Sequence, residues 1–378
     1  MEKKLKPRDS NVETFRCILM FLIVLYHCFV HGIFEGSRAY WTVIFSPFLT
    51  WHVDGFVAIS GWFGIRWSIG KFLHLFWTIL FYSMLSFMYV AIFNRESLAL
   101  HHVCVSAGWF GGTYLMLLML SPLLNLCVEE LCKMSRVEIL KGWGLFALAM
   151  FLTWAPRNLF TGVNASGAGG YSIIMMIFMY MTVRLIRLKN LPITLKHVGI
   201  GIGTFFLGIL LVGVVSAGVR MIKHHPIDGT CFRSLCTYDA PYVWVMAVSL
   251  MVYFGKFIHV PEWIGKIVRF IGPSMFGIYL CHDTTSFGTQ IYRIPETWLV
   301  QNTTFHPAII IPICAVGTFL VCLSIDLFRR MGMKCIEAIR FLLPHQKKIC
   351  CGSIYPFAAA AKVERHWRGI FDTALGEL

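Results

Sequence analysis

The sequence predicts an all-α integral membrane protein whose helices form a single bundle. Of its 378 residues, 57% are hydrophobic and only 14% carry a charge, and the mean hydropathy is +0.69. Soluble domains are more polar than this. Apolar stretches close to the roughly 20 residues that a bilayer requires recur along the whole chain. The composition therefore excludes an ordinary soluble globular protein.

The apolar stretches divide into about ten expected membrane-spanning helices. The second and ninth stand apart because Pro47 and Pro273 interrupt them and polar residues dilute them. The expected spans are residues 15–33, 42–64, 72–93, 109–128, 141–156, 169–187, 196–219, 240–259, 268–284 and 307–327. Because the connections are short, the sequence predicts one bundle over residues 1–340 and a cytoplasmic basic tail over residues 341–378.

The first stretch is expected to be a retained helix rather than a signal peptide. Basic residues precede it, but it is long and lacks a clear small-residue cleavage site. The longest segment expected outside the membrane covers about residues 220–239 and is polar enough to meet a polar substrate.

The distribution of positive charge predicts the orientation. The net charge is +14, which by itself would suit nucleic acid. With a cytoplasmic N-terminus and ten alternating spans, however, 26 of the 33 Lys and Arg residues fall on the inside. This asymmetry is the positive-inside pattern, so both termini are expected in the cytoplasm and nucleic acid is not an expected partner. A basic inner face also attracts membrane lipid headgroups and anionic cofactors.

Arg16 and His27 are the most informative residues of the first span. Eleven residues are about three helical turns and roughly 16 Å of rise, so the two side chains lie on nearly one face. Ionisable groups at membrane depth are costly and usually face a bundle interior or an aqueous cavity. Arginine suits anionic oxygens, and histidine suits proton transfer near neutral pH. The pair predicts a reaction channel, although Arg16 as a simple interfacial anchor is the alternative.

Further ionisable residues adjoin this pair in the predicted topology. His31 lies one turn beyond His27, either orienting an acceptor or filling the interface. Asp54 lies within the second span, where a carboxylate is costly unless paired or hydrated, and it is a candidate for orienting an imidazole. His52 is a weaker candidate. His282 and Asp283 are adjacent and diverge by about 100 degrees on a helix, so they do not simply act as a pair.

Basic residues gather where the second and third spans meet the expected inner surface. Arg66, Lys71 and His74 are either interfacial charges or part of an anionic donor site, and Lys71 and His74 are one turn apart. Arg184 and Arg187 are weaker candidates for the same role.

The thirteen cysteines show no metal-ligand spacing, and no metal is expected. Cys231 and Cys236 lie in the expected outside segment, where they either pair in an oxidising compartment or remain free.

Five sequence blocks, in order, resemble the membrane acyltransferase-3 family, which are polytopic bacterial enzymes that O-acylate envelope glycans. The opening RDSNVETFRCILMFLIVLYHCFVHG holds an Arg, ten residues and a His, here Arg16 and His27. The others are FVAISGWFGIR (56–66), WFGGTYLMLLMLSPLLN (109–125), GGYSIIMMIFMYMTVRLIR (169–187) and SMFGIYLCHD (274–283). Family members often carry paired arginines near the third helix, where this chain has Arg66, Lys71 and His74. No hydrolase-like domain is appended, so the chain looks closest to the stand-alone branch.

The resemblance implies an O-acyltransferase of the bacterial cytoplasmic (inner) membrane. It would move an acyl group, most often acetyl from acetyl-CoA, to a hydroxyl of a glycan or lipid-linked sugar. The implied roles are a base or acyl carrier at His27, donor binding at Arg16 and acceptor binding at His282. From their positions alone, Asp54 is expected to assist catalysis, His31 to help bind the acceptor, and Arg66, Lys71 and His74 to help bind the donor.

Two rival functions remain at this stage. The first is a transporter or flippase of lipid-linked glycan without chemistry, but the chain lacks the repeat symmetry common in transporters. The second is a membrane sensor or scaffold, which would not require buried Arg and His on one helix face.

Overall fold

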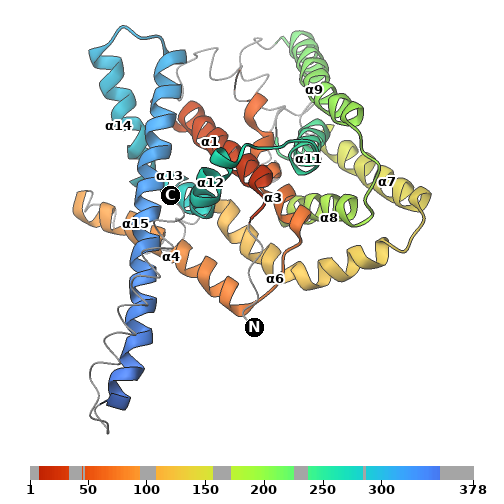
Figure 1. Cartoon of the computed structure of the whole chain (residues 1–378). Coiled ribbons are helices and arrows are strands. Elements are labelled where there is room, and N and C mark those ends of the chain that lie inside the picture. Colours follow the sequence, from red (N-terminus) through yellow and green to blue (C-terminus); the bar gives the residue numbers. More distant parts are fainter. Residues whose placement is uncertain are drawn as a thin grey trace.

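The computed structural model describes residues 8–33, 45, 47–93, 108–155, 172–224, 237–283 and 287–349. All regular structure in these residues is helical. Helix α1 (Ser10–His31) lies near the middle of the bundle, where α3, α11, α12, α13 and α15 pack around it (Figure 1). The two residues that the sequence singled out therefore belong to a central helix.

The other helices follow in chain order. They are α3 (Trp51–Phe63), α4 (Ile69–Phe93), α6 (Gly108–Leu131), α7 (Arg136–Ala155), α8 (Ile173–Leu188), α9 (Leu195–Ile222), α11 (Pro241–Lys256), α12 (Glu262–Ile271), α13 (Met275–Asp283), α14 (Phe287–Asn302) and α15 (Pro307–Ile349). Each of the ten expected spans overlaps helical residues, but α14 was not expected.

The chain is a multi-pass membrane protein. Among the described residues, six helical stretches are long and apolar enough to cross a bilayer: Ser10–His31, Ile69–Phe93, Trp109–Leu131, Leu195–Ile222, Glu262–Asp283 and Pro307–Cys335. Helices α3, α8 and α11 have 13, 16 and 16 residues and fall short of the usual length. The count of ten spans and the cytoplasmic placement of both termini stay predictions.

Helix α1 begins earlier than its apolar stretch because its first turn is capped. The expected start was residue 15, but the helix begins at Ser10, where the Asp9 side chain accepts a hydrogen bond from the Asn11 N–H. An aspartate at this position satisfies one of the unpaired N–H groups of the first turn. The polar residues before Phe15 are therefore helical and bring Glu13 into the bundle.

The ninth expected span is two helices joined by a short 3-10 turn over Gly272–Ser274. Pro273 lacks an N–H and cannot continue the hydrogen-bond ladder of α12, so the axis breaks there. Arg330 of α15 donates to the Phe270 carbonyl and to the Ser274 hydroxyl, at 3.3 and 2.9 Å. The break is therefore held by a side chain from another helix.

Helix α15 continues past both boundaries expected for it. The last span was expected to end near residue 327 and the bundle at residue 340, but the helix runs without interruption to Ile349. Residues 350–378, most of the expected tail, lie outside the described residues.

Candidate active site and donor channel

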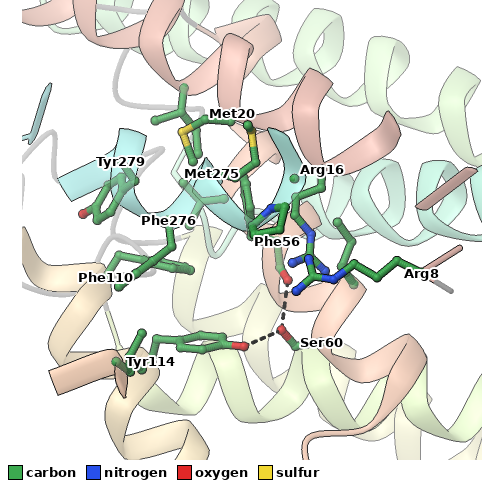
Figure 2. A pocket seen from close by; sticks show the side chains of 16 residues that line it. Arg8, Arg16, Met20, Phe56, Ser60, Phe110, Tyr114, Met275, Phe276 and Tyr279 are labelled. Atoms are coloured by element: carbon green, nitrogen blue, oxygen red, sulfur yellow. Dashed lines mark hydrogen bonds between the residues drawn. The ribbon is translucent and has the colours of Figure 1, made fainter. Parts of the chain in front are cut away.

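A cavity runs along one face of α1 between that helix, α3, α6 and the break between α12 and α13. It holds about 190 Å³ of open space. Figure 2 shows two arginines, Arg8 and Arg16, at one end and a group of aromatic rings at the other, Phe110, Phe276 and Tyr279. The cavity is therefore basic at one end and apolar along its length.

A second cavity of about 510 Å³ adjoins the basic end. The two cavities share Arg16, Ser60 and Tyr114 as wall residues, so they adjoin, and together they are termed the path. Its basic lining residues come from the chain start, α1 and the region between α3 and α4: Arg8, Arg16, Arg66, Lys71 and His74. The four residues expected to bind a donor thus lie together, and Arg8 joins them.

Glu13 lies beside both arginines of the first cavity, but its single negative charge neutralises only one of the two positive charges. Its carboxylate lies 3.5 Å from Arg8 Nη1 and 3.6 Å from Arg16 Nε, and it is buried. These distances exceed those of strong charge-assisted hydrogen bonds, which are about 2.7–2.9 Å. Two guanidinium groups thus face one carboxylate, which leaves positive charge in the path for an anion.

The wall beside the basic end is fixed by hydrogen bonds. The hydroxyls of Ser60 and Tyr114 are hydrogen-bonded to each other (dashed line in Figure 2), with 3.0 Å between the two oxygens. The Ile65 N–H donates to the Tyr180 hydroxyl at 3.0 Å, and that hydroxyl donates to Asn125 at 2.7 Å. These bonds hold the end of α3, so the path has a defined shape.

The two weaker donor candidates pack against the same end of α3 instead of lining the path. The Arg184 guanidinium lies so close to Gly64 that a Cβ there would overlap it, and Gly64 has a φ of +77°, which favours glycine. Arg187 stacks over the ring of Trp62 at 4.5 Å. Neither is among the residues that line the two cavities.

His27 lies one turn beyond the inner end of the cavity. Arg16, Met20 and Ile23 line the cavity at helical spacing, and His27 continues the same face of α1. Its Nδ1 is 3.7 Å from Asp283 Oδ1 of α13. This distance is too long for a hydrogen bond, but it is close enough for an ion pair once the imidazole is protonated, so the carboxylate can stabilise an imidazolium at His27.

His282 presents a second buried imidazole beside His27. The two ring centroids are 5.0 Å apart, and His282 has no exposed surface. Its Nδ1 is 2.6 Å from the Ile278 carbonyl oxygen, which can only accept. In the neutral ring Nδ1 therefore carries the proton, and Nε2 is an acceptor. No hydrogen-bond partner of Nε2 is found among the described residues.

Of the remaining predicted residues, His31 lies beside His27, whereas His52 and Asp54 are buried on α3. The ring of His31 is 5.5 Å from that of His27, as helical spacing predicted. His52 is fully buried, its ring lies 5.2 Å from that of Tyr26, and neither ring nitrogen has a hydrogen-bond partner within the described part of the chain. Asp54 is buried on α3, two residues further on, and therefore faces away from His52.

Asp283, and not Asp54, is the carboxylate that the structure places against His27. The sequence indicated only that Asp283 diverges from its neighbour His282 on a helix, and it indicated no other partner for Asp283. Because adjacent residues on α13 diverge, His282 bonds to its own helix while Asp283 reaches α1. Arg8, Glu13 and Tyr279 were also missed. Arg8 and Glu13 lie close to Arg16 in the sequence, and Tyr279 lies close to His282. Closeness in the sequence alone does not predict that these side chains share a cavity.

No cluster of three or more His, Cys, Asp or Glu side chains in the described ranges has the geometry to hold a metal ion. Cys231 and Cys236 lie outside these ranges, so their pairing stays a prediction.

Comparison with known proteins assigns the family. A family model described as an acyltransferase domain, of the acyltransferase-3 type, matches residues 9–327. The chain belongs to the acyltransferase-3 family. Its membership confirms the resemblance and identifies a membrane acyltransferase. The match ends within α15 and covers every residue that lines the two cavities except Arg8, as well as His27 and Asp283. No curated protein and no solved structure matches the chain.

Proposed function

We propose that this acyltransferase moves an acyl group, acetyl foremost, from acyl-CoA to a hydroxyl of a glycan or lipid-linked sugar at the bacterial cytoplasmic membrane. One observation carries the proposal: two adjoining cavities lead from five basic side chains along α1 to within one turn of His27, which lies beside Asp283. Family membership favours chemistry over the transporter alternative.

The basic end of the path suits the phosphates of coenzyme A. Arg16, Arg66 and Lys71 present guanidinium and ammonium groups, which bind phosphate oxygens by charge-assisted hydrogen bonds. The apolar length beyond them suits the pantetheine arm. The rise from Arg16 to His27 is roughly 16 Å, comparable to the reach of that arm. A thioester bound in this way would lie near His27.

The pair at the far end suits base catalysis of acyl transfer. His27 Nε2 takes the proton of the sugar hydroxyl as its oxygen attacks the thioester carbonyl. The carbon–sulfur bond breaks, the ester forms, and the proton passes from His27 to the leaving thiolate of coenzyme A. Asp283 stabilises the imidazolium that exists between these two proton transfers. The alternative is a double displacement: His27 first takes the acyl group from the thioester and releases the thiolate, and the sugar oxygen then takes the acyl group from acyl-His27 while its proton goes to the thiolate.

The acceptor is expected on the far side of His27 from the donor. His282 Nε2 is buried and free to accept a hydrogen bond from a sugar hydroxyl. His31, one turn beyond His27 and exposed, suits a position at the mouth of the acceptor site. Acceptor binding by His282 and His31 thus agrees with the arrangement of the rings.

The test is consumption of acyl-CoA by the purified protein in detergent, measured as free thiol released. A panel of acyl-CoA donors with crude envelope glycan as acceptor is compared for wild type, His27→Ala and the control His259→Ala, an exposed histidine between α11 and α12. We expect release by the wild type and the control and none by His27→Ala. No release from any donor, together with no binding of coenzyme A, would overturn the proposal and favour a transporter.

A further inference from the structure

Two side chains of helix α14 are hydrogen-bonded to the backbone at the end of α1 that carries the histidines. Arg293 Nε donates to the His31 carbonyl at 2.8 Å, and Glu296 Oε2 accepts from the Ile33 N–H at 2.9 Å. Both side chains come from one helix that is more than 250 residues away in the chain. Figure 1 shows α14 beside α15, where it also contacts α13 and α1.

The end of α1 has no cap of its own. Helices often end with a glycine in the left-handed region, whose N–H groups satisfy the last carbonyls. Gly32 follows α1 but has φ −68° and ψ −173°, which is extended backbone. The last carbonyls of α1 must therefore find partners elsewhere. Arg293 supplies one of them, and a cation at a helix C-terminus is also favourable electrostatically.

The contact with Glu296 is close and buried. Glu296 has no exposed surface. Its carboxylate lies so close to Gly32 that a Cβ on this glycine would overlap both carboxylate oxygens. The polar and titratable groups around it are Arg293 and Tyr292 of α14, Cys28 of α1 and Cys314 of α15. Burial raises the pKa of Glu296 to about 7. Burying a carboxyl group costs free energy unless the group is hydrogen-bonded, and the Ile33 N–H supplies that hydrogen bond.

We propose that α14 is a clamp in which Glu296 and Arg293 are positioning residues for His27. This inference rests on the proposed function of His27. The clamp fixes the last turn of α1, which contains His31, and His27 is one turn before it. Displacing a catalytic group by about 1 Å can cost on the order of 100-fold in rate. The clamp acts on the base through helix α1 and does not contact the donor cavities.

The experiment compares Glu296→Ala, Glu296→Gln and Arg293→Gln in the full-length protein in detergent, with the exposed Glu130→Gln as control. Glutamine keeps an oxygen that accepts from the Ile33 N–H. We expect Glu296→Ala to lower kcat for thiol release about tenfold or more with the KM for acetyl-CoA within about twofold of wild type. Glu296→Gln should retain at least about half of kcat. Arg293→Gln, which removes the donor to the His31 carbonyl, should lower kcat.

Hydrogen exchange of the α1 amides tests the clamp independently of activity. Faster exchange at residues 28–33 in Glu296→Ala, but not in Glu296→Gln, is the expected result. Unchanged exchange in Glu296→Ala would overturn the clamp, as would equal loss of kcat in both Glu296 variants. If the wild type neither binds coenzyme A nor releases thiol, the proposed function fails, while the exchange measurement still decides whether α14 holds α1.

Discussion

Replacing Asp283 by Asn tests the catalytic pair most directly. The substitution keeps the shape of the side chain and removes its charge. The His27 Nδ1 to Asp283 Oδ1 distance is 3.7 Å. At an effective dielectric constant of about 20, two unit charges at this distance attract by about 4 kcal/mol. This attraction exists only while His27 is an imidazolium, so its loss raises the barrier of the chemical step.

The expected loss follows from that energy. A change of 1.36 kcal/mol is tenfold in rate, so about 4 kcal/mol would be roughly 1,000-fold. The two side chains are 12% and 21% exposed, so solvent reduces the attraction. We therefore expect Asp283→Asn to lower kcat roughly 100- to 1,000-fold. The KM for acetyl-CoA should change little because Asp283 does not line the donor cavities.

The assay is thiol release from acetyl-CoA with coenzyme A binding measured on the same preparations. Glu130→Gln, an exposed charge-removing substitution, is the control. Asp54→Asn is compared in parallel because the sequence made Asp54 a candidate for orienting an imidazole. A kcat for Asp283→Asn within about threefold of wild type would refute the electrostatic reasoning. A large loss in Asp54→Asn alone would return the role to that residue.

Three further predictions concern the donor, the acceptor and pH. Arg16→Gln should raise the KM for acetyl-CoA about tenfold or more but leave that for acetyl-pantetheine, which lacks the nucleotide phosphates, within about twofold, as paired kinetic assays would show. His282→Gln should lower transfer to glycan while coenzyme A binding, measured by calorimetry, is unchanged. Glu296 has a pKa of about 7 in the folded protein against 4.5 ordinarily. The folded state then binds more protons between these values, so stability is fully present below about pH 4.5 and falls as pH rises towards 7, by up to about 3 kcal/mol. Melting temperatures of wild type and Glu296→Gln across pH 5–8 check this, since the variant should lose the dependence.

The sequence predicted those parts of the fold that depend on local periodicity. Apolar stretches of bilayer length marked the helices, and spacing of eleven residues placed Arg16 and His27 on one face. Arg66, Lys71 and His74 line one cavity because they lie close together in the sequence, at the junction of α3 and α4. These inferences need only the geometry of a helix and the polarity of the bilayer.

Contacts between distant segments could not be predicted in the same way. Asp283 is 256 residues from His27, and nothing in the local pattern of α13 says which helix it faces. Helix α14 was missed because Pro295 and polar residues made the segment look like a connection. Its buried residues Gly288, Tyr292 and Glu296 recur every four positions, which is the spacing of one helical face. This four-residue spacing can be read from the sequence, but the proline and the polar residues of the segment favoured a connection over a helix.

The packing of α13 against α15 yields a last prediction. A Cβ at Gly277 would overlap Asp326 Oδ1. Asp326 cannot move aside easily because Arg329 Nε donates to it at 2.7 Å and the Tyr82 hydroxyl at 2.9 Å, and all of this is buried. We expect Gly277→Ala to destabilise the protein by about 1–3 kcal/mol, the usual cost of overpacking.

The same substitution should also disturb catalysis. Pushing α13 away from α15 moves the helix that carries His282 and Asp283, so kcat should fall even in molecules that remain folded. Gly317→Ala on α15 is the matched control, since a Cβ there meets nothing within 4 Å and alanine favours the helix. Melting temperature and thiol release are measured on both variants. Equal stability of the two would contradict the account of the α13–α15 contact, and an unaltered kcat in Gly277→Ala would show that the His27–Asp283 distance does not depend on it.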